Sequence, residues 1–164
     1  MAIPIECERR FLVSGEEWRS RVRHSRKIRQ GYLTTADDVT VRVRRIGSSS
    51  AYLTIKTPHE GVGRVELEYQ IPPDHADFLM ETACGSRIVK KTRHEVTANG
   101  VSWVIDEFEG DNLGLVIAEV ELECMERQLT LPDWVGPEVT AIDRFHNSHL
   151  AEHPFADWDE LKRA

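Results

Sequence analysis

The stretch I-E-C-E-R-R-F at residues 5–11 places three charged side chains, Glu6, Glu8 and Arg10, at every second position. In a β-strand, residues two apart point to the same face. This stretch therefore predicts a strand with two carboxylates and a guanidinium on one side, and with Ile5, Cys7, Arg9 and Phe11 on the other.

Like-charge doublets at the same spacing recur along the chain. The acidic doublets are Glu66/Glu68 and Glu119/Glu121, the basic doublets are Arg42/Arg44 and Lys91/Arg93, and Lys56 stands alone in a further alternating segment. The residues between the members of three of these doublets, Val43, Leu67 and Val120, are apolar. Each segment thus predicts a strand with one charged and one packed face.

Such doublets need compensation. Two like charges about 7 Å apart repel by roughly 0.6 kcal/mol in water and about 2.4 kcal/mol at an effective dielectric of 20. Acidic pairs attract divalent cations and basic pairs attract polyanions. For any single doublet a solvated strand face is the alternative, and Arg42 and Arg44 could also pair with acids on a neighbouring strand.

The remaining pattern predicts a β-rich chain with a few helices. Strands are expected at residues 3–13, 39–46, 51–57, 64–71, 87–97, 101–108 and 115–124, with residues 27–34 extended. A helix is expected to start near Ser14, and another of about ten residues near Pro72. Residues 133–164 are expected to be helical in pieces, with apolar side chains packing on the body: Phe145, Leu150, Phe155, Trp158 and Leu161.

Short turns between successive strands indicate a mainly β fold with packing helices (α+β), built on an antiparallel sheet. An open sheet would expose the charged face to water, whereas a closed eight-stranded antiparallel β-barrel would enclose it as a polar tunnel. We expect the closed barrel, formed by residues 1–164 as a single domain.

Composition narrows the class of protein. The 164 residues carry a net charge of −7, which argues against nucleic-acid binding and favours a small anion held in a local positive pocket. No apolar run is long enough for a membrane span and no signal peptide is evident, so a cytoplasmic protein without membrane association is expected. No feature of the sequence specifies an oligomeric state.

Two other sets of residues could suggest metal chemistry. Cys7, Cys84 and Cys124 are widely spaced, which indicates buried free thiols rather than a zinc site. His146, His149 and His153 fall at helical spacing and could bind a transition metal, but they lack an acidic or thiol partner in a known pattern. We expect them to be surface histidines.

Taken in order, the charged motifs resemble the CYTH superfamily, the triphosphate tunnel metalloenzymes, over nearly the whole chain. The family's E-x-E-x-K strand is similar to residues 6–10, with Arg10 in the lysine position. Further matches follow in the family's order: Arg42/Arg44, Lys56, Glu66/Glu68, Lys91/Arg93, Asp106 and Glu119/Glu121. The chain most resembles the bacterial inorganic triphosphatases of this family.

The resemblance implies roles for these residues. Metal ligands for Mg²⁺ or Mn²⁺ would come from Glu6, Glu8 and Glu121, with Glu119 and Asp106 nearby. Phosphates would be held by six basic side chains: Arg10, Arg42, Arg44, Lys56, Lys91 and Arg93. Glu66 and Glu68 would serve a second metal or position the attacking water, and Lys91 is also expected to act in catalysis. Hard carboxylate ligands suit both metals.

The expected function is metal-dependent hydrolysis of a small-molecule triphosphate, most of all inorganic tripolyphosphate to pyrophosphate and phosphate. A class IV-type adenylate cyclase is an alternative that needs a purine pocket, and a thiamine or nucleoside triphosphatase is a closer variant. Arg10 also leaves open a non-catalytic polyphosphate binder, because a planar guanidinium does not place charge as a lysine ammonium does.

Overall fold

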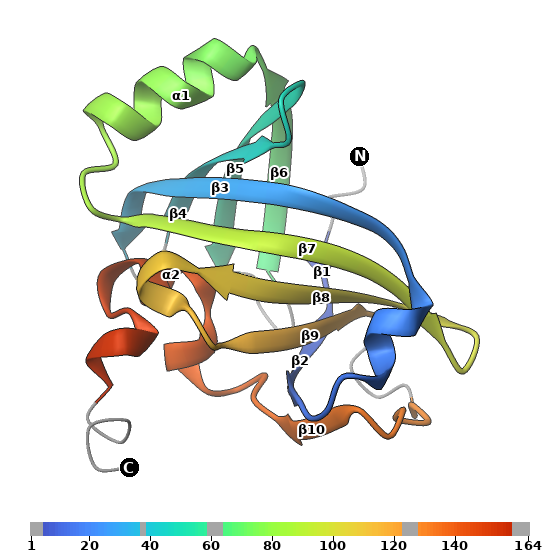
Figure 1. The fold of residues 1–164 in the computed structure, drawn as a ribbon. Helices are drawn as coiled ribbons and strands as arrows, with labels where there is room; N and C mark the ends of the chain where they lie inside the picture. Colours follow the sequence, from blue (N-terminus) through green and yellow to red (C-terminus); the bar gives the residue numbers. More distant parts are fainter. Residues whose placement is uncertain (1–4, 37–38, 59–63, 123–127, 159–164) are drawn as a thin grey trace.

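The computed structural model describes residues 5–36, 39–58, 64–122 and 128–158 and shows one antiparallel sheet accompanied by two α-helices (Figure 1). The strands are β1 (Ile5–Glu6), β2 (Glu8–Val13), β3 (Val22–Ala36), β4 (Val39–Ile46), β5 (Ser50–Pro58), β6 (Arg64–Ile71), β7 (Ile88–Ala98), β8 (Val101–Glu109), β9 (Val116–Glu121) and β10 (Val135–Glu138). The helices are α1 (Pro73–Thr82) and α2 (Asn147–Glu152).

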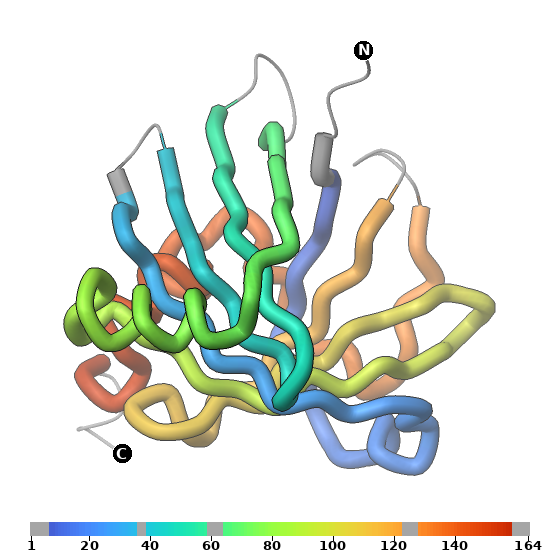
Figure 2. The backbone as a smooth tube through the Cα atoms, turned by 90° about the horizontal axis from the view of Figure 1, so that it is seen from above, coloured from blue at the N-terminus to red at the C-terminus, as the bar shows by residue number. Residues whose placement is uncertain are grey.

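Neighbouring strands in the sheet follow the order β1-β6-β5-β4-β3-β7-β8-β9-β2-β10. β1 and β2 lie near opposite ends of this order, although only Cys7 separates them in the chain. β1 pairs with β6 and β2 pairs with β9, so the N-terminal segment runs between the green β6 and the orange β9 in Figure 2. The sheet therefore curves so that its two ends approach the same N-terminal segment, which contains β1 and β2.

The mainly antiparallel β fold with packing helices is confirmed, but the closed eight-stranded barrel is not. The described residues form ten strands, and hydrogen bonds do not close the sheet. β2 already pairs on its two edges with β9 and β10. Contact with β6 is left to the two residues of β1, and the Cys7 carbonyl accepts instead from the Leu122 amide at 2.8 Å.

Two hydrophobic clusters cover the outer face of the sheet. α1 packs its buried Ala76 and Met80 on Val43 and Ala51 of β4 and β5. The other cluster joins side chains of β2, β7, β8 and β9 to Trp18 and Trp134. Along each strand these apolar residues alternate with the charged doublets, so they lie on the opposite face of the sheet, as the period of two predicts.

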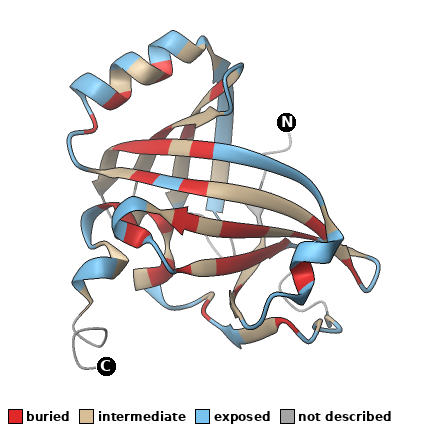
Figure 3. Ribbon diagram, viewed as in Figure 1, coloured by how far each residue is buried: buried red, intermediate tan, exposed pale blue. Residues whose placement is uncertain are grey.

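A third cluster lies on the inner face and fills one end of the enclosed space. Val89, Phe108 and Ile117 share their face with the charged positions of β7, β8 and β9, and they pack against Phe145 and Leu150 from the C-terminal segment. The red positions along these strands in Figure 3 show how much of the sheet is buried. The inner face is thus apolar at one end and charged along the rest.

Several local expectations are corrected. The segment after Ser14 forms a short 3₁₀ helix at Glu17–Arg21 rather than an α-helix, and no side chain caps its start. β10 was not expected, because its sequence V-G-P-E lacks strand character. The C-terminal segment is helical in short pieces, and Phe145, Leu150, Phe155 and Trp158 pack there as predicted.

Some expectations fall outside the described part of the chain. Cys84 is buried and Cys7 half-buried, both as free thiols, whereas Cys124 and Leu161 lie outside the described residues. Within the described residues, none of the helices is both long and apolar enough to cross a membrane.

Candidate functional site

The strand register brings the charged doublets onto one inner face. Residues that pair across an antiparallel ladder point to the same side. Arg10 is opposite Glu119, Arg93 is opposite Asp106, and Lys56 is opposite Glu66. The predicted site residues with described side chains are all on this face. The side chain of Glu6 lies outside the described ones, and its backbone pairs with Arg64 in β1 and β6.

Charged side chains of β2, β9, β8 and β7 form a continuous chain of ion pairs, called here the first network: Glu8, Arg10, Glu119, Arg93, Asp106 and Lys91. Arg10 contacts Glu8 and also donates from Nε to Glu119 at 3.1 Å. Arg93 donates to Glu119 at 2.9 Å and to Asp106 at 2.7 Å. Lys91 Nζ completes the chain with a 2.6 Å bond to Asp106.

Burial and neighbouring charges shift the pKa values of three side chains of the first network. Asp106 is completely buried and Lys91 is 2% exposed. Burial lowers the pKa of Lys91 to about 8, although Asp106 opposes this fall. Burial would raise the pKa of Asp106 and of Glu119, but Arg93 and Lys91 outweigh it and hold both values below their ordinary range. The two carboxylates therefore stay ionised around neutral pH.

Asn147 connects the first network to the C-terminal segment. It begins α2, and its Oδ1 accepts a hydrogen bond from Lys91 Nζ at 2.9 Å. Lys91 thus has two oxygen partners, one charged and one neutral, which fix its ammonium group. No local pattern in the sequence signals this contact, because the two residues are 56 positions apart.

A second network occupies β4, β5 and β6, and its members are Arg42, Arg44, Thr54, Lys56, Glu66 and Glu68. Lys56 pairs with Glu66 at 2.8 Å and Arg44 pairs with Glu68 at 2.7 Å. Thr54 donates to Glu68 at 3.1 Å. Within the described part of the chain, the Nε groups of Arg42 and Arg44 are buried without a hydrogen-bond acceptor. The network therefore keeps unused cationic donors.

Tyr32 and Gln30 of β3 are further inner-face residues outside the expected site set. Tyr32 is buried opposite Arg42. Gln30 donates to its phenol oxygen at 2.9 Å. Burial raises the pKa of Tyr32, while the charges of Arg42 and Lys56 oppose that rise. The phenol therefore lies among the basic side chains of the second network.

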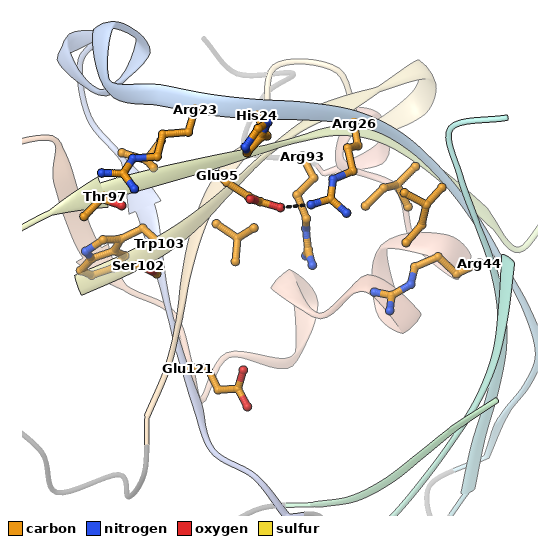
Figure 4. A pocket seen from close by; sticks show the side chains of 14 residues that line it. Arg23, His24, Arg26, Arg44, Arg93, Glu95, Thr97, Ser102, Trp103 and Glu121 are labelled. Atoms are coloured by element: carbon orange, nitrogen blue, oxygen red, sulfur yellow. Dashed lines mark hydrogen bonds and ion pairs between the residues drawn. The ribbon is translucent and has the colours of Figure 1, made fainter. Parts of the chain in front are cut away.

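A cavity of about 560 Å³ opens between the two networks. Arg44, Arg93 and Glu121 point into it from different strands (Figure 4). Arg26 of β3 also lines it, paired with Glu95, and Arg23 lies beside the register shift between Val22 and His24. Both arginines were absent from the expected set, and a strand irregularity of this kind re-aims a side chain.

Carboxylates gather on the β2–β9 side of this cavity. Glu8 and Glu121 are direct partners across the ladder, and like charges so placed repel unless a cation lies between them. Glu121 makes no hydrogen bond or ion pair within the described part of the chain. Together with neighbouring Glu119, these hard oxygen donors fit Mg²⁺ or Mn²⁺. The described side chains nevertheless contain no ready group of three acidic, His or Cys residues placed to hold a metal.

Comparison with known proteins places this fold and site in a family. The model of the CYTH domain matches residues 4–149, and the chain belongs to the CYTH domain family.

Two relatives cover almost the whole chain. An inorganic triphosphatase of Acetivibrio thermocellus is 39% identical over 155 residues, covering 94% of this chain and 98% of the relative. An inorganic triphosphatase of Nitrosomonas europaea is 33% identical over 153 residues, covering 89% and 96%. A solved crystal structure of an inorganic triphosphatase has a TM-score of 0.65 at 32% identity and covers 92% of this chain and 97% of that one.

Proposed function

We propose that this protein hydrolyses inorganic tripolyphosphate to pyrophosphate and phosphate with the help of a divalent metal ion. The observation that carries the proposal is the cavity itself, which is lined by Arg44, Arg93 and Glu121, a carboxylate without a partner among the described residues. The relatives named inorganic triphosphatase support the same activity. Phosphoryl transfer depends mainly on positioning and charge neutralisation, which these side chains offer.

The basic residues would bind and orient the phosphate chain. Arg42, Arg44 and Lys56 approach from β4 and β5, while Arg10, Lys91 and Arg93 approach from β2 and β7. Arginine can donate two parallel hydrogen bonds to one phosphate. Buried Asp106 would act by holding Lys91 and Arg93 in place, since both already donate to it.

The metal would be held by Glu8 and Glu121 with Glu119 beside them, and Glu6 belongs to the same proposed set. When bound there, a divalent ion supplies charge neutralisation at phosphate oxygens and can activate water. The curved sheet would enclose the substrate as a tunnel, with the apolar cluster around Phe145 and Leu150 blocking one end. Exclusion of water at that end would strengthen every charge interaction inside.

Glu66 and Glu68 would position the attacking water and accept its proton. The water oxygen forms a bond to the terminal phosphorus, the P–O bond to the leaving pyrophosphate breaks, and the proton passes to a carboxylate. In this structure Glu66 pairs with Lys56 and Glu68 with Arg44. These contacts would hold the two carboxylates beside the phosphates bound by the same cations.

The test is phosphate release from tripolyphosphate by the purified protein with MgCl₂ or MnCl₂. We expect turnover with at least one metal and loss of turnover after removal of metal with EDTA. Absence of turnover with both metals would contradict the hydrolase proposal.

A substrate panel separates the neighbouring activities. Tripolyphosphate should be hydrolysed faster than ATP or thiamine triphosphate, because the described cavity residues offer charge to a phosphate chain. Faster ATP or thiamine triphosphate hydrolysis would reassign the substrate, and cyclic AMP formed from ATP would indicate a cyclase. Tight binding of tripolyphosphate without product would identify a polyphosphate binder.

A further inference from the structure

Arg10 occupies the position between two proposed metal ligands. Its guanidinium contacts Glu8 on its own strand and donates from Nε to Glu119 on β9 at 3.1 Å. The three side chains are only 14%, 20% and 9% exposed, respectively. Lysine stands at this position in the E-x-E-x-K pattern that residues 6–10 resemble, whereas the guanidinium of Arg10 reaches two carboxylates at once.

The bridge competes with a metal ion for the same oxygens. A carboxylate that accepts hydrogen bonds from a guanidinium offers fewer lone pairs to a cation, and the positive charge of Arg10 repels a divalent ion at close range. Among the described residues Glu121 has no such partner, but one carboxylate alone is a poor site for Mg²⁺ or Mn²⁺. This accounts for the lack of a ready acidic cluster among the described side chains.

We infer that Arg10 exchanges partners during binding and thereby couples the metal to the phosphate chain. Metal binding takes Glu8 and Glu119 from Arg10, and a phosphate oxygen then becomes the partner of the released guanidinium. Each ligand favours the arrangement that the other needs. The inference rests on the proposed function for the identity of the anion.

Thermodynamic linkage gives this exchange a measurable form. If phosphate binding raises the affinity for metal by some factor, metal raises the affinity for phosphate by the same factor. Lysine at position 10 keeps the charge but lacks the planar fork that reaches two carboxylates together. The Arg10→Lys variant should therefore bind metal more readily when no phosphate is present.

The experiment titrates the protein with MnCl₂ alone and follows free Mn²⁺ by electron paramagnetic resonance. We expect Arg10→Lys to bind Mn²⁺ about tenfold more tightly than the wild type, a change within the usual range for coupled sites. Calorimetry with a tripolyphosphate analogue carrying methylene bridges, with and without MnCl₂, gives the coupling factor after correction for chelation in protein-free buffer. That factor should be smaller in the variant.

The matched control is Arg9→Lys, the same exchange on the opposite face of β2, where Arg9 donates two hydrogen bonds to Glu138 at 2.9 and 2.6 Å. It should change the affinity for MnCl₂ alone by less than twofold. Equal Mn²⁺ affinities of wild type and Arg10→Lys, or an equal gain in Arg9→Lys, would overturn the inference. Arg10→Gln serves as a second variant if Arg10→Lys does not fold.

The readout also separates this inference from the proposed function. Mn²⁺ binding needs no turnover, so a protein that fails to hydrolyse tripolyphosphate still gives an interpretable titration. If the enzyme is active and its Mn²⁺ affinity is the same with Arg10→Lys, the result would contradict the inference and leave the proposed function standing.

Discussion

Individual residues of the site differ in what they contribute to the fold. Asp106 is completely buried and pairs with both Lys91 and Arg93, so its removal takes the carboxylate partner from the buried Lys91 ammonium, which is costly. Glu121 is exposed to the cavity and is unpaired within the described part of the chain. Metal binding and stability should therefore be separable at Glu121 and inseparable at Asp106.

Substitution of Glu121 tests the proposed metal position. Glu121→Gln should lower Mn²⁺ affinity roughly 10–100-fold, because a neutral amide oxygen replaces a charged ligand. Its free energy of unfolding should change by no more than about 0.5 kcal/mol. The check is a Mn²⁺ titration together with urea unfolding.

Glu81→Gln is the control for that substitution, since Glu81 is exposed on α1. It should leave both quantities unchanged. Glu8→Gln should also abolish metal binding, and unaltered Mn²⁺ affinity in Glu8→Gln and Glu121→Gln would remove the β2–β9 carboxylates from the proposed ligand set.

The titration of Lys91 predicts a pH dependence of anion binding. Its pKa is lowered to about 8, so in the free protein the ammonium is mostly charged at pH 7 and mostly neutral at pH 9. Affinity for the methylene-bridged triphosphate should fall across this interval, measured by calorimetry without metal. Lys91→Arg keeps its charge throughout, so it should lose this dependence, while both proteins share any change in the ligand's own protonation. Parallel pH profiles would contradict the assignment.

At the scale of elements, the apolar end of the enclosed space depends on the C-terminal segment. Leu150 of α2 is buried in the cluster that contains Phe108 and Ile117. The same helix begins with Asn147, which binds Lys91. Packing of α2 is therefore linked to the position of a proposed catalytic side chain.

Leu150→Ala should lower the free energy of unfolding by about 2–5 kcal/mol, through lost burial and a residual cavity. Activity measured well below the unfolding transition should fall too, because Asn147 would no longer hold Lys91 firmly. Leu113→Ala is the control, with Leu113 72% exposed, and should cost less than about 1 kcal/mol. Chemical denaturation of both variants measures these two changes in the free energy of unfolding.

The sequence predicted the elements that carry a strong local period. The period of two located the doublet strands, and the dipeptide Asn99-Gly100 between β7 and β8 favours the positive φ angles that both residues adopt in this hairpin turn. β10 was not predicted because V-G-P-E has no alternation of polar and apolar residues. The contact between Asn147 and Lys91 escaped because it depends on how the C-terminal segment returns to the sheet, which no local pattern encodes.

At the scale of the whole molecule, the interior charges predict stabilisation by ligands. A metal–triphosphate complex that binds only the folded state, at 100 times its dissociation constant, would add about 2.7 kcal/mol. For a chain of this length, Tm should rise by roughly 5–10 °C. Calorimetric scans with MnCl₂ and the methylene-bridged analogue check this, with sodium sulfate at equal ionic strength as the control. An equal rise with sulfate would mean a general anion effect.

The overall shape was only partly accessible from the sequence. Alternation identified the charged face, and the predicted site residues with described side chains lie on it. The arrangement of the two ends of the sheet could not be predicted, because it depends on β10, which pairs with the second edge of β2. Because β2 pairs with β10, the edge of β6 that faces away from β5 pairs with the short β1.

The division of the N-terminal segment at Cys7 has a practical consequence for handling the protein. Residues 5–6 and 8–13 border opposite ends of the sheet, and the same few residues include Glu6, Glu8 and Arg10. An amino-terminal purification tag, or a deletion that removes this segment, would disturb the circumference of the sheet and the proposed ligands together. A carboxy-terminal tag is therefore the safer choice for assays, and a tag-dependent loss of Mn²⁺ affinity would itself report on this shared boundary.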